Sequence, residues 1–248
     1  MALIKVGNMN DFSVSAKKKV LKNQPRFKNI ATFKELKEIS IESQPNSFEL
    51  ITSEDKRGLA LKGIKLTKDF EGFLKNVFNP TNEIYFIAWA WDMSGEKVNQ
   101  YPGENVNAET VLIPLKAGKL REFIGEGINL FPKRKVTGGI AIRIQLWESD
   151  DEVRSFGKTL SATTKAIEKS ELNQLLSLIA TGTGVSGVTI NLVKNAAIEL
   201  SKVIGTILQV NGDDYVDFFE GYYASDQTWS ANDETYNGNA SLITLRKY

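Results

Sequence analysis

The sequence predicts a mainly β protein, an antiparallel β-sandwich with an inserted α-helical pair near residues 163–208. Three observations predict it. Residues 138–147 alternate aliphatic with other side chains at a period of two, which is typical of a β-strand. Residues 163–208 instead repeat their apolar residues at helical spacing. Short segments rich in glycine, asparagine and aspartate separate the other extended runs, as turns do between antiparallel strands.

The chain divides into a basic N-terminal arm, residues 1–30, and a sandwich domain, residues 31–248. The arm carries lysines at 17–19 and has few apolar partners, so it is expected to be a solvated or loosely docked tail. The alternative is a segment that docks on a partner subunit or an anionic surface.

Extended runs are expected at residues 38–41, 47–51 and 58–66, followed by a loop over 67–82. The most apolar strand is 83–91, where both faces carry apolar side chains. This pattern fits a central strand that is covered on both sides. It also fits a strand with one face available to a partner. Trp89 and Trp91 are therefore predicted to be core residues or, alternatively, membrane or partner contacts.

Residues 110–115 read as a short strand, and residues 131–135 (FPKRK) as a basic turn. Lys133, Arg134 and Lys135 form a solvated hairpin in one interpretation and a lipid or partner contact in the other. The strand 138–147 follows, with one face expected to be buried, and it runs into an acidic loop at residues 148–152.

Two helices are expected over residues 163–179 and 188–208, separated by a Gly-Ser-Thr segment. Their apolar stripes would pack on the sandwich or on each other. In a second interpretation the pair leaves the sandwich and enters a membrane, although Lys194, Glu199 and Lys202 would be costly in hydrocarbon. After a turn at 211–214 the chain returns to a strand at 215–223, a polar loop at 224–239 and a last strand at 240–248.

The amino-acid composition excludes several kinds of catalytic and metal-binding site. The chain has 248 residues, 31 basic and 30 acidic, with no cysteine and no histidine. Thiol nucleophiles, disulfides, thiolate metal sites, Ser-His-Asp triads and imidazole-bound metals are therefore excluded. The balanced charge does not favour nucleic acid. We expect a non-enzymatic protein.

The first residues lack the pattern of a secretory signal. The sequence therefore predicts synthesis in the cytoplasm without a signal peptide, with release by another route left open.

Three segments resemble the calcium- and lipid-binding C-two β-sandwich family. The first runs from Asp69 to the strand at 82–86, similar to an acidic loop before a strand that carries a tyrosine. The second is residues 146–150, similar to a strand that ends in an Asp-x-Asp cation loop. The third is residues 212–216, similar to the Asp-Asp-aromatic-aliphatic step after that loop. Asn82 stands where the family pattern has an acidic ligand, Glu148 where it has aspartate, and Asp217 where it has glycine.

The resemblance implies a calcium site with oxygen ligands, completed by lipid phosphates. The residues that would form it are Asp69, Glu148, Asp150, Asp213 and Asp214.

We therefore predict a β-sandwich binding module that engages membrane lipid or a protein partner, with calcium as a candidate cofactor. Two alternatives stay open: a pore-forming, toxin-like protein that inserts the helical pair, and a structural subunit of a larger assembly, including a homo-oligomer. A carboxylate-based hydrolase that uses Glu148, Asp150 and Asp214 is the least favoured.

Overall fold

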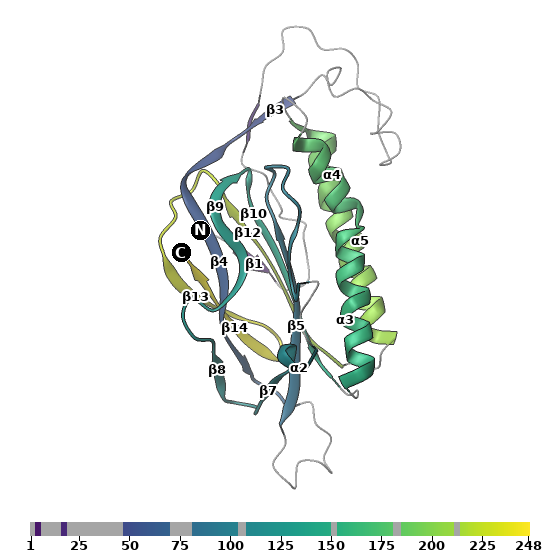
Figure 1. The fold of residues 1–248 in the computed structure, drawn as a ribbon. Coiled ribbons are helices and arrows are strands. Elements are labelled where there is room, and N and C mark those ends of the chain that lie inside the picture. Colours follow the sequence, from purple (N-terminus) through teal and green to yellow (C-terminus); the bar gives the residue numbers. More distant parts are fainter. Residues whose placement is uncertain are drawn as a thin grey trace.

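The computed structural model describes residues 3–5, 16–18, 47–69, 81–103, 108–149, 153–180, 185–210 and 214–248. They build three layers: an outer sheet, a central sheet and a layer of helices (Figure 1). The predicted fold class, a β-sandwich with a helical insertion, is confirmed. The two large sheets that the described residues form have six and five strands.

The central sheet has the strand order β1-β12-β10-β5-β6, and β7 also pairs with β5. All its pairs are antiparallel. Its strands are β1 (Leu3–Lys5), β5 (Asn82–Trp91), β6 (Asn99–Tyr101), β7 (Ile113–Leu115), β10 (Gly139–Glu148) and β12 (Asp214–Ala224). The two longest pairings, of β10 with β5 and with β12, place β10 at the middle of the sheet.

The outer sheet has the order β13-β14-β4-β8, with β9 also paired to β4. Its strands are β4 (Thr52–Leu66), β8 (Leu120–Glu122), β9 (Ile128–Thr137), β13 (Asn232–Asn237) and β14 (Ser241–Lys247). The pairing of β4 with β9 shifts register several times between Thr52 and Ala60. A third, small sheet joins β2 (Ala16–Lys18), β3 (Ser47–Leu50) and β11 (Val185–Ser186).

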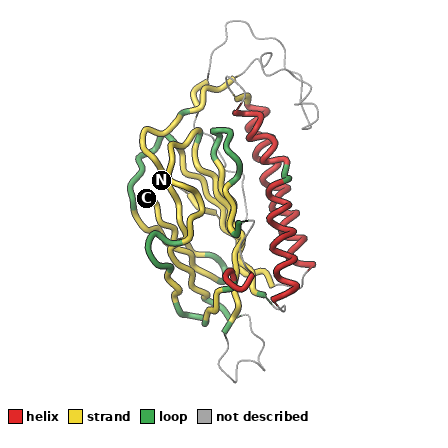
Figure 2. The backbone as a smooth tube through the Cα atoms, viewed as in Figure 1, coloured by secondary structure: helices red, strands yellow, loops and turns green. Residues whose placement is uncertain are grey.

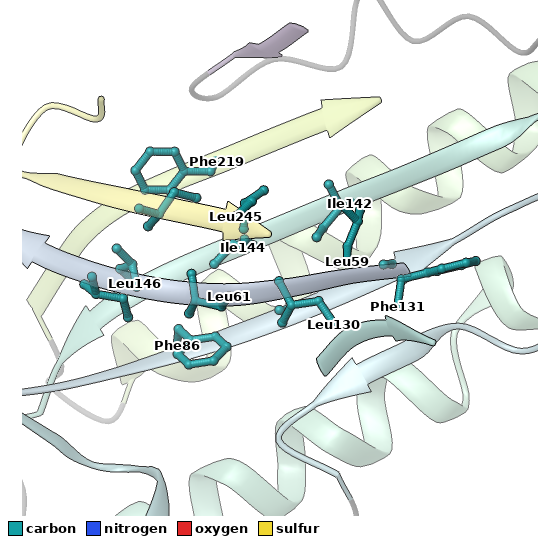
Figure 3. Packing of buried hydrophobic residues seen from close by; sticks show 14 of the residues in the cluster. Leu59, Leu61, Phe86, Leu130, Phe131, Ile142, Ile144, Leu146, Phe219 and Leu245 are labelled. Carbon is teal, nitrogen blue, oxygen red and sulfur yellow. The ribbon is translucent and has the colours of Figure 1, made fainter. Parts of the chain in front are cut away.

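A hydrophobic core lies between the two large sheets. Alternate residues of β5 and β10 point into it, among them Phe86, Ile142 and Ile144, and they meet Leu59 and Leu61 of β4 (Figure 3). All five are at most 1% exposed. The period of two seen in the sequence places these side chains on one face of the sheet.

The helices lie against the other face of the central sheet (Figure 2). α3 (Val153–Glu168) and α4 (Glu171–Ala180) follow one another, and α5 (Gly187–Val210) runs back beside both. Ser170 separates α3 from α4: its hydroxyl accepts the backbone N–H of Asn173 at 3.3 Å, as an N-cap residue does. The Asn173 amide ties α4 to the sheet by accepting the backbone N–H of Val98.

A second core fills the space between the helices and the central sheet. Tyr85, Ile87, Trp89 and Trp91 of β5 meet the apolar stripes of α4 and α5 there. Both faces of β10 are buried, whereas only one buried face was expected. The second face is buried because the inserted helices cover it, a long-range arrangement that local periodicity does not reveal.

Several boundaries differ from the prediction. The helical layer begins at Val153, not at 163, and Ser170 interrupts its first segment. Residues 110–115 contain the end of α2 (Ala108–Val111) and then β7. The expected polar loop at 224–239 contains β13, because the residues NDETYN alternate exposed and half-buried side chains against β14.

Parts of the N-terminal arm pair with the body of the protein. β1 pairs with β12, where Leu3 is opposite Tyr222, and β2 pairs with β3. The remaining arm residues and the expected strand at 38–41 lie outside the described residues. Among the described parts, no helix is long and apolar enough to cross a membrane.

Candidate functional site

The predicted calcium ligands are only partly brought together. Glu148 and Asp214 are register partners at the ends of β10 and β12. Glu148 is buried and Asp214 is exposed, and Asp69 is exposed at the end of a described segment. Asp150 and Asp213 lie outside the described residues. Within the described ranges, no three acidic side chains gather closely enough to hold a metal ion, so the calcium site stays a prediction.

The basic residues of 131–135 lie inside strand β9 and not in a turn. Arg134 is a structural residue: it forms an ion pair of 2.9 Å with Asp92 and donates to the Ser94 hydroxyl at 2.8 Å. Lys133 and Lys135 are exposed on the outer sheet. Their contact with lipid or a partner stays a prediction, while Arg134 is held by the sandwich.

Trp89 and Trp91 are not surface residues. Their exposed fractions are 0% and 1%, and both pack beneath the helices. The prediction that they form a membrane or partner contact is wrong for this fold, and the alternative core assignment is the observed one. Helices α4 and α5 cover the face of β5 on which a partner was the alternative.

A cleft near the C-terminal strands groups charged and aromatic side chains. Its volume is about 450 Å³, within the ~300–1,000 Å³ range of small-molecule sites. We call it the Trp229 cleft. It is lined by Arg57, Tyr223, Ala224, Asp226, Gln227, Thr228, Trp229, Glu234 and Lys247.

Trp229 forms the aromatic wall of the cleft. Its ring lies 5.3 Å from the Arg57 guanidinium and 5.5 Å from the Lys247 ammonium, both within cation–π range. Tyr223 packs edge-on against it at 5.7 Å between ring centroids. The indole N–H donates to the Tyr248 carbonyl at 3.4 Å. These contacts hold the half-buried ring in one orientation.

Arg57 positions the loop that carries Trp229. Its two terminal nitrogens donate to the carbonyls of Ala224 at 2.7 Å and Gln227 at 2.6 Å. The side chain reaches that loop from β4, where the register shifts near Arg57. Burial lowers the pKa of Arg57, and the carboxylates of Asp55 and Asp226 oppose that shift.

A polar network forms the opposite wall. Lys247 forms an ion pair of 2.5 Å with Glu234, which also accepts the Tyr236 hydroxyl. The Tyr236 and Tyr223 hydroxyls are 3.3 Å apart. Burial raises the pKa of Glu234, but hydrogen bonds from Lys247, Tyr236 and Asn232 outweigh it, so its pKa lies below the ordinary value.

The two tyrosines stay protonated at neutral pH. Burial raises the pKa of Tyr223 well above its ordinary value, and the neighbouring Tyr236 and Glu234 add to the shift. Burial and the hydrogen bond to Glu234 raise the pKa of Tyr236 as well. A general acid or base works best with a pKa near the working pH. These groups therefore suit hydrogen bonding better than proton transfer.

The sequence did not predict the Trp229 cleft. Its members come from β4, the end of β12, the loop that follows β12, β13 and β14. Residues 224–239 were expected to be a polar loop. A tryptophan inside that polar stretch was the available signal, because a large aromatic residue in a loop needs a packing partner or a ligand.

Comparison with known proteins adds no assignment: no family model, curated relative or solved structure matches the chain.

Proposed function

We propose that this protein is a non-enzymatic β-sandwich binding module and that the Trp229 cleft binds a neutral, hydroxyl-rich ligand, a saccharide. The observation that supports this is the lining of the cleft, where Asp226 and Glu234 stand among Arg57 and Lys247 around one indole. A free anion would meet the two carboxylates, and a free cation would meet the ammonium and guanidinium groups.

A neutral hydroxyl group avoids both conflicts. Each hydroxyl is donor and acceptor at once, so it can donate to Glu234 or Asp226 and accept from Lys247 or Thr228. The C–H groups of a sugar ring supply apolar surface for Trp229. A concave site with an aromatic wall and a few fixed polar groups is the usual form of a small-ligand site.

The protonation states also favour binding over catalysis. Glu234 is held ionised by its donors, and Tyr223 and Tyr236 are held neutral. A ligand would therefore meet fixed hydrogen-bonding partners at neutral pH.

Affinity electrophoresis tests the proposal. The protein is run in native gels that contain one neutral glycan each: a β-glucan, a xylan, a galactomannan or a glycogen. At least one should retard the protein, and Trp229→Ala should restore its mobility. Tyr215→Ala, which removes an aromatic side chain 48% exposed and outside the cleft, is the matched control and should be retarded as the native protein is.

Two outcomes would count against the proposal. Unchanged mobility in every glycan would contradict saccharide binding. Equal retardation of Trp229→Ala and the native protein would mean that the glycan binds outside the Trp229 cleft.

A further inference from the structure

A second groove lies between α5 and the central sheet, apart from the Trp229 cleft. Its volume is about 330 Å³. Trp147, Ile198 and Phe218 contribute apolar walls, and Tyr215 stands over Trp147 with 5.5 Å between ring centroids. We call it the α5 groove.

Gly205 opens this groove. It lies inside the 24-residue helix α5, where a glycine costs roughly 1 kcal/mol relative to alanine. Close packing does not require a glycine here, because a Cβ built at this position meets nothing within 4 Å. The small residue instead leaves space in the wall of the groove.

A buried guanidinium forms the floor. Arg143 is 3% exposed and donates to the Ala197 carbonyl at 2.9 Å, to the Ser201 hydroxyl and to Glu220 at 2.6 Å. Its Nε is buried and has no hydrogen-bond partner among the described residues. A buried donor left unpaired costs about 1–3 kcal/mol. An acceptor that enters the groove from outside would recover that cost.

Among the described residues, the charged side chains that line the groove are those of Arg143 and Lys202. Glu220, which pairs with Arg143, is buried and is not part of the lining. Lys202 is mostly exposed, and its partner Glu199 is an exposed neighbour on the same helix, so the pair is weak. The ammonium group can turn toward an anion at the rim.

We propose that the α5 groove binds an amphipathic anion, an apolar chain or ring that ends in a carboxylate. The apolar part lies along Trp147, Ile198 and Phe218. The carboxylate takes the side of Arg143 and Lys202, where charge-assisted hydrogen bonds are available. This site is independent of the saccharide proposal, since the two cavities share no lining residue.

The test compares three probes with the same chain: octanoate, 1-octanol and octylamine. Binding is followed by NMR shifts of the Trp147 indole N–H and the Gly205 amide in the full chain. Octanoate should bind about tenfold or more tightly than octanol, and octylamine should bind weakest, because only the carboxylate gains a charged partner.

Gly205→Leu should abolish the shifts by filling the groove, while Gly205→Ala, which adds one methyl group, should keep them. Lys202→Glu, an exposed substitution, should weaken octanoate binding and leave octanol binding unchanged. Equal affinity for all three probes would reduce the groove to an apolar surface and overturn the proposal. Absence of shifts at Trp147, or full binding by Gly205→Leu, would overturn it too.

Discussion

The backbone of Gly238 lies directly against the carboxylate of Asp217, so that a Cβ on Gly238 would lie 2.4 Å from Oδ2. Asp217 is fully buried on β12 and accepts the backbone N–H groups of Asn239 and Ala240, both at 2.9 Å, and the Ser241 hydroxyl at 2.6 Å. One side chain of the central sheet thus organises the turn between β13 and β14 of the outer sheet. Its role here is structural.

Gly238→Ala should destabilise the protein by about 1–3 kcal/mol, because the added methyl group must displace a buried, fully used carboxylate. Urea unfolding followed by circular dichroism would measure it. Gly103→Ala is the control, since a Cβ there meets nothing within 4 Å. Equal stability of Gly238→Ala and the native protein would mean that the turn can move away from Asp217.

Asp217→Asn should cost about 1–3 kcal/mol for a different reason. The amide has the same size as the carboxylate, but its NH2 group would face the N–H and O–H groups that now donate to Asp217. Ser241→Ala removes only one of those donors and should cost less. Both values come from the same urea experiment, and the reverse order would contradict this account of the turn.

Glu220→Gln should destabilise the protein by about 3 kcal/mol or more, because it leaves the buried Arg143 charge uncompensated. The pair spans 2.6 Å, with side chains 4% and 5% exposed. The exposed pair Lys202–Glu199 is the matched control, and Glu199→Gln should change stability by less than about 0.5 kcal/mol. Replacing both members, as Arg143→Met with Glu220→Leu, should recover much of the loss. Similar losses for Glu220→Gln and Glu199→Gln would refute the difference between the two pairs.

Stability should fall at alkaline pH. Burial raises the pKa of Tyr215 to about 12, with Asp217 adding to the shift, and Tyr223 and Tyr236 are also raised above their ordinary value of 10.0. The native state therefore holds these protons after the unfolded state has lost them. The stability that these tyrosines contribute is fully present below about pH 10 and is lost as the pH rises through their pKa values in the folded state.

Urea unfolding at several pH values between about 8 and 12 would show this, with a shallower fall for Tyr236→Phe. Absorbance at the tyrosinate band supplies an independent readout. Ionisation of every tyrosine near its ordinary pKa in the native protein would contradict the burial argument.

Calcium binding remains testable at Glu148 and Asp214. A cation bound only by the native state, at 100 times its dissociation constant, adds about 2.7 kcal/mol and raises the melting temperature by several degrees. The melting temperature is compared in excess chelator and in millimolar calcium, for the native protein and for Asp214→Asn. An unchanged melting temperature would contradict the calcium site that the sequence predicts.

Local patterns predicted much of the fold. Apolar alternation in β5 and β10 assigned their side chains to two faces, and the helical repeat placed the insertion between β10 and β12. The same patterns were less informative at the boundaries, since the start of α3 and the strand β13 carry weak periodicity. They missed the Trp229 cleft altogether, because Arg57 and Lys247 meet Trp229 from strands far apart in the chain.

The sequence by itself determined the class of the fold, the apolar character of both faces of β5 and the exclusion of thiol and imidazole chemistry, because each follows from residue type and short-range spacing. Only the tertiary structure decided what covers each face. Trp89 and Trp91 are core residues because α4 and α5 pack on them. Arg143 pairs with Glu220 because β10 and β12 are neighbours. Such contacts join residues that are distant in the chain, and periodicity along the chain carries no information about them.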